Sequence, residues 1–157
     1  MRILVLALIC YVAAARYAAA QSQPSLRVRA ERDLSFGTLL PGVSETIQPT
    51  DPASSGHFGI TGPRFSSIDI LFALPTALTG PSGTQLLLSF GPTDGGYSPT
   101  AAIGSQVSFD PRLRFVARLS ESGRGFVYIG GTVSPAGTQR PGSYAAGITV
   151  TVAFTGL

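Results

Sequence analysis

The strongest pattern in the chain is an alternation of apolar and small or polar residues near its C-terminus. From Gly142 to Phe154 the apolar positions share one parity, and Ser, Thr, Ala and Gly fill the other. A period of two is typical of a β-strand with one buried face. The large apolar residues of this face are Ile148, Val150, Val152 and Phe154. Burying all four would contribute roughly 6–12 kcal/mol, so we expect the strand to pair within its own chain and to be essential to the core.

Similar but shorter alternations recur along the chain, separated by turns rich in Gly and Pro. They predict strands within 26–30, 34–40, 43–47, 58–60, 68–74, 86–90, 113–119 and 124–133. A bulge or turn is expected at 31–33 and a break at Gly130–Gly131, while 76–83 and 91–104 are expected to be turn and loop. No stretch has a helical period. Roughly eight or nine strands with these spacings predict an all-β fold, an immunoglobulin-like antiparallel β-sandwich.

The first 20 residues have the features of a cleavable export signal. A basic start at Arg2 precedes an apolar run over 3–15, and small residues at 18–20 form a cleavage site. We expect cleavage between Ala20 and Gln21, which removes 20 of the 157 residues and leaves 137 as one domain, 21–157. The apolar run is too short to span a bilayer comfortably. The mature chain is therefore expected to have no membrane span and to lie in the periplasm, at the cell surface or outside the cell.

Charge and cysteine content exclude several kinds of site. The chain has 11 arginines, no lysine and eight acidic residues, and two of the arginines leave with the signal, so the mature net charge is +1. Nucleic-acid binding requires a concentrated basic face, and we expect no such partner. Cys10, the only cysteine, lies in the signal. The mature chain is therefore expected to have no disulfide and no thiolate metal site.

Four ordered motifs resemble a known domain family. They are DLSFGT at 33–38 followed by PG, FGITG at 58–62, YIGGTV at 128–133, and GSY at 142–144 leading into ITVTV. Their order and spacing resemble the DUF4402 family, an exported bacterial domain family of unknown function. That family is similar in general plan to fimbrial subunits and spore-coat-U-like domains. The resemblance implies a role at the cell surface or in an appendage, with no catalytic residue or cofactor.

His57, the only histidine, is the one candidate for neutral-pH acid–base chemistry. A hydrolase would need a serine nucleophile beside it and an acid to orient it, and the chain has no G-x-S-x-G elbow. A histidine metal site lacks partners in the sequence. We interpret His57 as an exposed histidine beside a turn, and we expect the protein not to be an enzyme.

Two further features have both a functional and a structural interpretation. Arg112, Arg114 and Arg118 share one strand parity. They could contact an acidic glycan or a partner, but we favour a solvated strand face whose charges discourage edge pairing. Tyr97 lies in the expected loop 91–104 and is the best candidate for a contact residue, because binding residues concentrate on loops.

These observations predict an exported structural or adhesive surface protein, similar to a pilin or fimbrial subunit. Its expected partners are identical or related subunits, joined by strand exchange. The N-terminal strand, with alternating Leu26, Val28 and Ala30, is the expected donor because its side chains are smaller and its end is free. The alternative is a secreted binding module, for example for a glycan, that uses the loops around Tyr97.

Overall fold

The structure is a computed structural model that describes residues 25–155, so the expected signal and its cleavage site at Ala20–Gln21 lie outside the described residues. The described chain contains twelve strands and two short 3-10 helices. Every strand ladder is antiparallel. The expected all-β antiparallel sandwich is confirmed.

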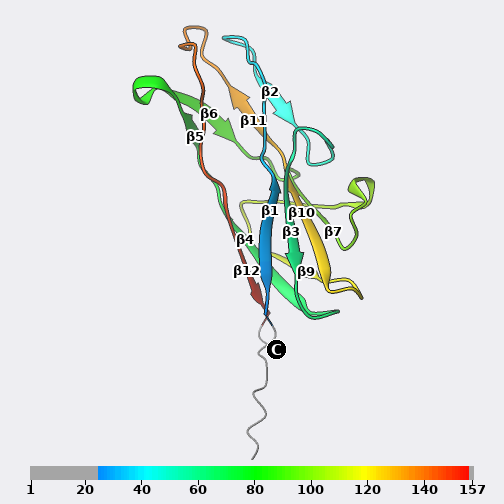
Figure 1. The fold of residues 1–157 in the computed structure, drawn as a ribbon. Helices are drawn as coiled ribbons and strands as arrows, with labels where there is room; N and C mark the ends of the chain where they lie inside the picture. The colour runs from blue at the N-terminus through cyan, green and yellow to red at the C-terminus, as the bar shows by residue number, and fades with distance from the viewer. Residues whose placement is uncertain (1–24, 156–157) are drawn as a thin grey trace, which may run out of the picture.

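The strands form three sheets (Figure 1). The first sheet has the order β1 (Arg27–Arg32), β3 (Gly56–Thr61), β10 (Arg124–Ile129), β7 (Gly95–Ser98) and β8 (Val107–Phe109). The second has the order β2 (Glu45–Ile47), β11 (Gly131–Ser134), β6 (Gln85–Ser89) and β5 (Ala77–Thr79). The third has the order β12 (Thr149–Phe154), β4 (Ser67–Ala73) and β9 (Phe115–Arg118). The 3-10 helices are η1 (Pro81–Gly83) and η2 (Ile103–Ser105).

A break at Gly130 links the first two sheets. It divides an extended run into β10 and β11, as the Gly130–Gly131 pair predicted. Gly130 N–H donates to Asp94 O at 2.8 Å, and a side chain at Gly130 would lie 2.2 Å from Ile47 O. Only glycine allows this approach, so the chain can leave one sheet and enter the next.

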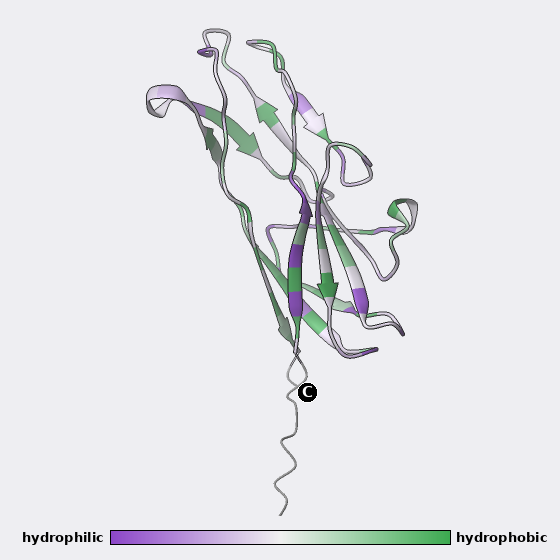
Figure 2. Cartoon of the chain, viewed as in Figure 1, coloured by the Kyte–Doolittle hydropathy of each residue, from purple (hydrophilic) through white to green (hydrophobic). Residues whose placement is uncertain are grey.

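Two apolar clusters form the core. The first contains Ile60, Ile68, Ile70, Tyr97, Phe109, Ala117, Leu119 and Val127. The second contains Leu86, Leu88, Phe90, Ile129 and Val133. The even-numbered apolar residues of β4 and β6 point inward as their alternation predicted, and Figure 2 shows the same alternation of apolar and polar residues along β1.

The expectation that residues 91–104 form a loop is wrong. This range contains β7, which lies between β10 and β8 in the first sheet. Because β7 begins with two glycines, it has no alternation of apolar and polar residues that would predict a strand. The ring of Phe109 lies where a side chain at Gly95 would be, and Gln106 covers Gly96 in the same way. Close approach of neighbouring side chains is a known reason for glycine within a strand. The expected turn at 76–83 likewise contains the short strand β5.

The C-terminal alternation is a paired strand only in its second half. β12 pairs with β4 from Thr149 opposite Ala73 to Phe154 opposite Ile68. Upstream, residues 142–148 make only one isolated bridge, between Ala145 and Thr79. Pro75 separates β4 from β5 and cannot donate a ladder hydrogen bond, so no neighbour is available for the residues between.

The expectation of a fully buried face on the terminal strand is therefore wrong. Val150 and Val152 are half-buried against the first cluster, and Ile148 is half-buried against the second. Phe154 is 38% exposed. The apolar side chains of this face therefore stabilise the fold by less than complete burial would, because each of them stays partly exposed.

Candidate functional site

The candidate site is a groove between two segments without regular secondary structure, one that follows β1 and one that precedes β12. The N-terminal wall, residues 33–41, continues from β1, and the C-terminal wall, residues 139–148, leads into β12. In Figure 1 these two segments separate beyond β1 and β12. Both line a cavity of about 1090 Å³. This volume is at or above the upper end of ordinary ligand pockets, about 300–1,000 Å³.

The floor of the groove is the second core cluster. Leu86, Leu88 and Ile129 are almost fully buried there, at 1–4% exposure. Half-buried Phe58 and Leu78 complete this floor. Leu86, Leu88 and Ile129 are thus closed off from solvent, and the apolar surface that the groove offers comes from its half-buried residues.

The walls contribute apolar side chains from both sides. Leu34, Phe36 and Leu39 of the N-terminal wall are half-buried against the second cluster, as are Tyr144 and Ile148 of the C-terminal wall. Ala146 shares the parity of the last two residues and lines the groove, yet it is exposed. Ala146 thus faces the groove, and no other described segment covers it there.

Most backbone groups along the walls have no backbone partner among the described residues. On the N-terminal wall, Ser35 N–H donates to Ser54 O at 2.9 Å, and Leu40 O accepts from Val43 N–H. On residues 142–148 of the other wall, only Ala145 exchanges hydrogen bonds, with Thr79. An apolar groove bordered by unpaired backbone is the kind of site to which an added β-strand can bind.

Side-chain contacts fix the C-terminal wall in place. Tyr144 Oη donates to Arg140 O at 2.7 Å and accepts from Gln139 Nε2 at 2.7 Å. Its ring lies over Gly80, where an added Cβ would be 2.3 Å from a ring carbon. The wall is therefore held by contacts of its own chain and does not need an occupant to form.

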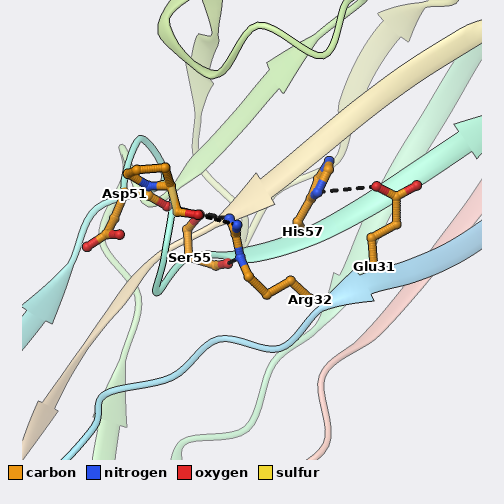
Figure 3. Close-up of polar contacts among 6 residues, drawn as sticks. Glu31, Arg32, Asp51, Ser55 and His57 are labelled. Carbon is orange, nitrogen blue, oxygen red and sulfur yellow. Dashed lines mark hydrogen bonds and ion pairs between the residues drawn. The ribbon is translucent and has the colours of Figure 1, made fainter.

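Arg32 fixes the start of the N-terminal wall (Figure 3). Its Nε donates to Ser55 O at 2.7 Å, and another guanidinium nitrogen donates to Ser55 Oγ at 2.9 Å. A third bond goes to Pro52 O. The loop that receives these bonds is ordered by Asp51, whose carboxylate accepts from Ala53 N–H and Ser54 N–H, and these bonds lower the pKa of Asp51. Arg32 thus anchors the chain directly after β1.

His57 is covered, and the expectation of an exposed histidine is wrong. Its side chain is 16% exposed, and its ring stacks on Tyr128 with a centroid distance of 4.4 Å. Nδ1 lies 3.3 Å from Glu31 Oε2 (Figure 3). Burial lowers the pKa of His57 below its usual 6.5.

Among the described residues, His57 has an acid beside it but no hydroxyl or thiol hydrogen-bonded to its Nε2. Glu31 could orient the imidazole as an acid does in a catalytic triad. However, His57 Nε2 is buried and contacts no hydrogen-bonding group of the described chain. Over residues 25–155, no group of three or more His, Cys, Asp or Glu side chains is placed to hold a metal ion.

Tyr97 is in the core, which corrects its assignment to an exposed loop. It is 5% exposed, and its hydroxyl donates to Arg118 O at 2.6 Å. Burial raises the pKa of Tyr97 to about 12. The residues that follow it, 99–101, do reach the surface and line a second, more open hollow of about 550 Å³. Tyr97 itself offers no surface to a ligand.

The arginines of β9 and the turn before it have partners within the chain. Arg112 pairs with Asp110 at 2.6 Å, and Arg114 pairs with Asp69. Arg118 Nε donates to Phe65 O at 3.0 Å, and its guanidinium lies over the Phe65 ring. This pattern is typical of the solvated strand face that we favoured.

The sequence did not predict the groove. Leu34 and Phe36 were expected in a continuing strand, and Leu78 in a turn. The one signal that could have located the gap is Pro75, which interrupts the strand opposite the C-terminal alternation.

Comparisons with known proteins do not assign a family to the chain. No family model matches it, and no curated protein matches it. The resemblance to DUF4402 remains a prediction. No helix within the described range is long and apolar enough to cross a membrane.

Proposed function

We propose that this chain is an exported structural or adhesive subunit, similar to a fimbrial subunit, that assembles with copies of itself by strand exchange and has no catalytic activity. The observation that carries the proposal is the groove, which is lined by half-buried apolar side chains and by backbone that is largely unpaired. A strand in the groove would cover these half-buried side chains and pair with the walls. Each large apolar side chain that it buried would contribute roughly 1.5–3 kcal/mol.

The proposed occupant is the N-terminal segment of a second copy, residues 21–30. Its Leu26, Val28 and Ala30 alternate with arginines, so one face is apolar and the other charged. In the free chain, residues 27–30 of this segment belong to β1 and pair with β3. β1 is an edge strand whose side chains are exposed up to Glu31, with Val28 at 38%. Leaving its own sheet would uncover Leu26, which is partly buried against the first cluster, so the groove must bury comparable apolar surface in exchange.

Ala146 allows a direct test of the groove. It faces the groove, is exposed, and so tolerates a larger side chain without disturbing the core. We expect a labelled peptide of residues 21–30 to bind the chain 21–157, measured by fluorescence anisotropy. Ala146→Arg should weaken this binding at least about tenfold, or roughly 1.4 kcal/mol, because it places a cation in the path of a peptide that contains two arginines.

The matched control is Ala153→Arg, which adds the same side chain to the exposed, outward-facing parity of β12. It should leave peptide binding unchanged. Absence of peptide binding to the unmodified chain would contradict the proposal. So would equal affinities for the Ala146 and Ala153 variants, because binding would then occur elsewhere.

The alternative function, a secreted binding module, has lost its named contact residue. A glycan surface around Tyr97 requires that side chain to be accessible, whereas the structure places it in the first core cluster. Strand exchange is therefore the better supported of the two proposals.

A further inference from the structure

We propose that the outer face of the first sheet carries a binding site for an acidic polysaccharide, built on Arg27 and Arg29 of β1 and Arg124 of β10. These three residues are called the arginine patch. The inference goes beyond the proposed function and does not depend on strand exchange. It concerns the free chain, in which β1 is paired with β3.

The pairing of β1, β3 and β10 brings the three arginines together. Arg27 and Arg124 lie opposite Thr61 on its two sides. Arg29 follows two residues further along β1. Residues directly opposite each other share a face of the sheet, and neighbouring strands lie about 4.8 Å apart, so the backbones of Arg27 and Arg124 are roughly 10 Å apart. All three arginines are exposed, and one extended ligand can therefore reach all of them.

The patch lies on the face that points away from the core. Ile60 of β3 and Val127 of β10 have the opposite parity and are buried in the first core cluster. The alternation along β1 in Figure 2 is the alternation between these two faces. On the strands of this sheet, the exposed large apolar residues are Val28 and Val107, and both lie opposite core residues. The outer face of these strands thus presents no large apolar side chain to enter a membrane.

The side chains of the patch are available to a ligand. Among the described residues, the carboxylates that form ion pairs do so with His57, Arg112 and Arg114, and not with the patch. The guanidinium hydrogen bonds within the described chain also come from other arginines, which are Arg32, Arg112, Arg114 and Arg118. The arginine patch is therefore a concentration of positive charge that its own chain does not neutralise by direct contact.

Arg124 is positioned by the ring beneath it. Its guanidinium carbon lies 5.6 Å from the centre of the Phe126 ring, which is a cation–π contact. Phe126 is only 6% exposed, so it supports the guanidinium and offers little surface of its own. A guanidinium in this position keeps its N–H donors, and these can bind a carboxylate through two parallel hydrogen bonds. The chemistry of the patch therefore fits a ligand with acidic groups.

A hollow beside Arg124 has room for part of a sugar chain. This second hollow, of about 550 Å³, is lined by Arg124, by the turn 120–122 and by residues 99–101. Its volume is within the range of ordinary ligand pockets, about 300–1,000 Å³. Ser120, Ser122 and Thr100 contribute hydroxyl groups to its lining, and hydroxyls both donate and accept hydrogen bonds. Guanidinium groups next to a hydroxyl-lined hollow favour a saccharide with acidic groups over a simple anion.

Two carboxylates border the site and restrict where the acidic groups of the ligand can lie. Glu121 lines the hollow. Glu31 lies over β3 at the other end of the patch, since a Cβ at Gly59 would be 2.4 Å from Glu31 Oε1. Both would repel an anionic group placed beside them. The acidic groups are therefore expected between them, on the arginine patch, and neutral hydroxyls of the same chain are expected beside Glu121, whose carboxylate accepts hydrogen bonds.

Titration of the chain 21–157 with an oligomer of galacturonic acid tests the inference. Isothermal titration calorimetry at neutral pH and low salt should show binding. Arg124→Gln should weaken it about tenfold, because a charge-assisted contact is lost. Arg29→Gln should cause a loss of similar size. Both side chains are exposed, so circular dichroism should show the same fold for both variants and for the unmodified chain.

The matched control is Arg112→Gln, which removes the same charge from the turn before β9, where Arg112 pairs with Asp110. It should leave the affinity unchanged, and a neutral oligomer of glucose should not bind. Absence of binding to the galacturonic acid oligomer would overturn the inference. So would equal binding of the glucose oligomer, or an equal loss in Arg112→Gln, because net charge would then explain the effect. Binding of phosphatidylglycerol vesicles in place of the oligosaccharide would assign the patch to a membrane and would also overturn it.

The position of the ligand can be checked separately by amide NMR. Chemical shifts should change at Gly59, at Thr61 and in the turn 120–122 when the galacturonic acid oligomer is added. Residues 142–148 of the groove should keep their shifts. Changes confined to the groove would overturn the inference even if the oligomer binds.

The result is distinguishable from a failure of the proposed function. Arg124 belongs neither to the groove nor to the donor segment 21–30, so Arg124→Gln should leave binding of the 21–30 peptide unchanged. Oligosaccharide binding without peptide binding would support this site and refute strand exchange. Peptide binding without oligosaccharide binding would do the reverse. If both occur, the two should oppose each other, because the polysaccharide binds β1 in its own sheet and strand exchange removes it.

Discussion

Tyr144 and Tyr97 show that the same residue type can lie in a groove wall or in the core, depending on what it contacts. Tyr144 holds a groove wall by packing its ring over Gly80 and bonding to Arg140 O. Tyr97 crosses the core to donate to Arg118 O. Both residues lie in Gly-containing stretches that look alike in the sequence. The difference comes from residues that are distant in the sequence, Gly80 for Tyr144 and Arg118 for Tyr97, so tyrosine type and local context alone could not separate them.

Gly80 should be required for the shape of the groove. In Gly80→Ala the new methyl group would be 2.3–2.6 Å from carbons of the Tyr144 ring. The ring must move, and overpacking of this kind costs about 1–3 kcal/mol. Urea unfolding should therefore show a lower free energy of unfolding. Gly137→Ala is the matched control, because nothing lies within 4 Å of its added Cβ; its effect should stay within about 0.5 kcal/mol. Similar effects of the two changes would contradict the packing at Gly80.

Among the elements, β12 and the segment before it show what alternation can and cannot predict. The parity of Val150 and Val152 gave the inward face, because side-chain direction in a strand depends only on local geometry. The length of the strand was not predictable in the same way. Pairing needs a neighbour, and the neighbour is interrupted at Pro75, far away in sequence. β7 was missed for a similar reason, since Gly95 is required by the ring of Phe109.

The contribution of β12 to the core can be measured with two substitutions on adjacent residues. Half-buried Val150 packs against the first cluster, so Val150→Asp should lower the free energy of unfolding by about 2 kcal/mol, because it places a carboxylate without a partner against apolar side chains. Thr151→Asp lies on the exposed parity and should change it by no more than about 0.5 kcal/mol. Circular dichroism during urea unfolding gives both values. A stable Val150 variant would mean that β12 is dispensable for the fold.

For the whole molecule, the central feature is a β-sandwich with a seam, the groove between residues 33–41 and 139–148. The seam lies between the segments that join β1 and β12 to the rest of the domain, and the ends of the described chain lie at the opposite ends of these two strands (Figure 1). The described core has no disulfide to compensate for the gap, because the only cysteine is Cys10. An added strand from another copy would cover the exposed part of the second cluster and link successive subunits.

Cross-linking between two single-cysteine chains tests this account most directly. The chain 21–157 has no cysteine of its own, so Val28→Cys in one copy and Ala146→Cys in another can be joined only between copies. Mixed at neutral pH with a short bismaleimide, these chains should give a heterodimer identified by mass. Val28→Cys mixed with Ala153→Cys should not, because Ala153 faces away from the groove. A heterodimer with Ala146→Cys alone is the predicted result. Its absence, or an equal yield with Ala153→Cys, would contradict strand exchange at the groove.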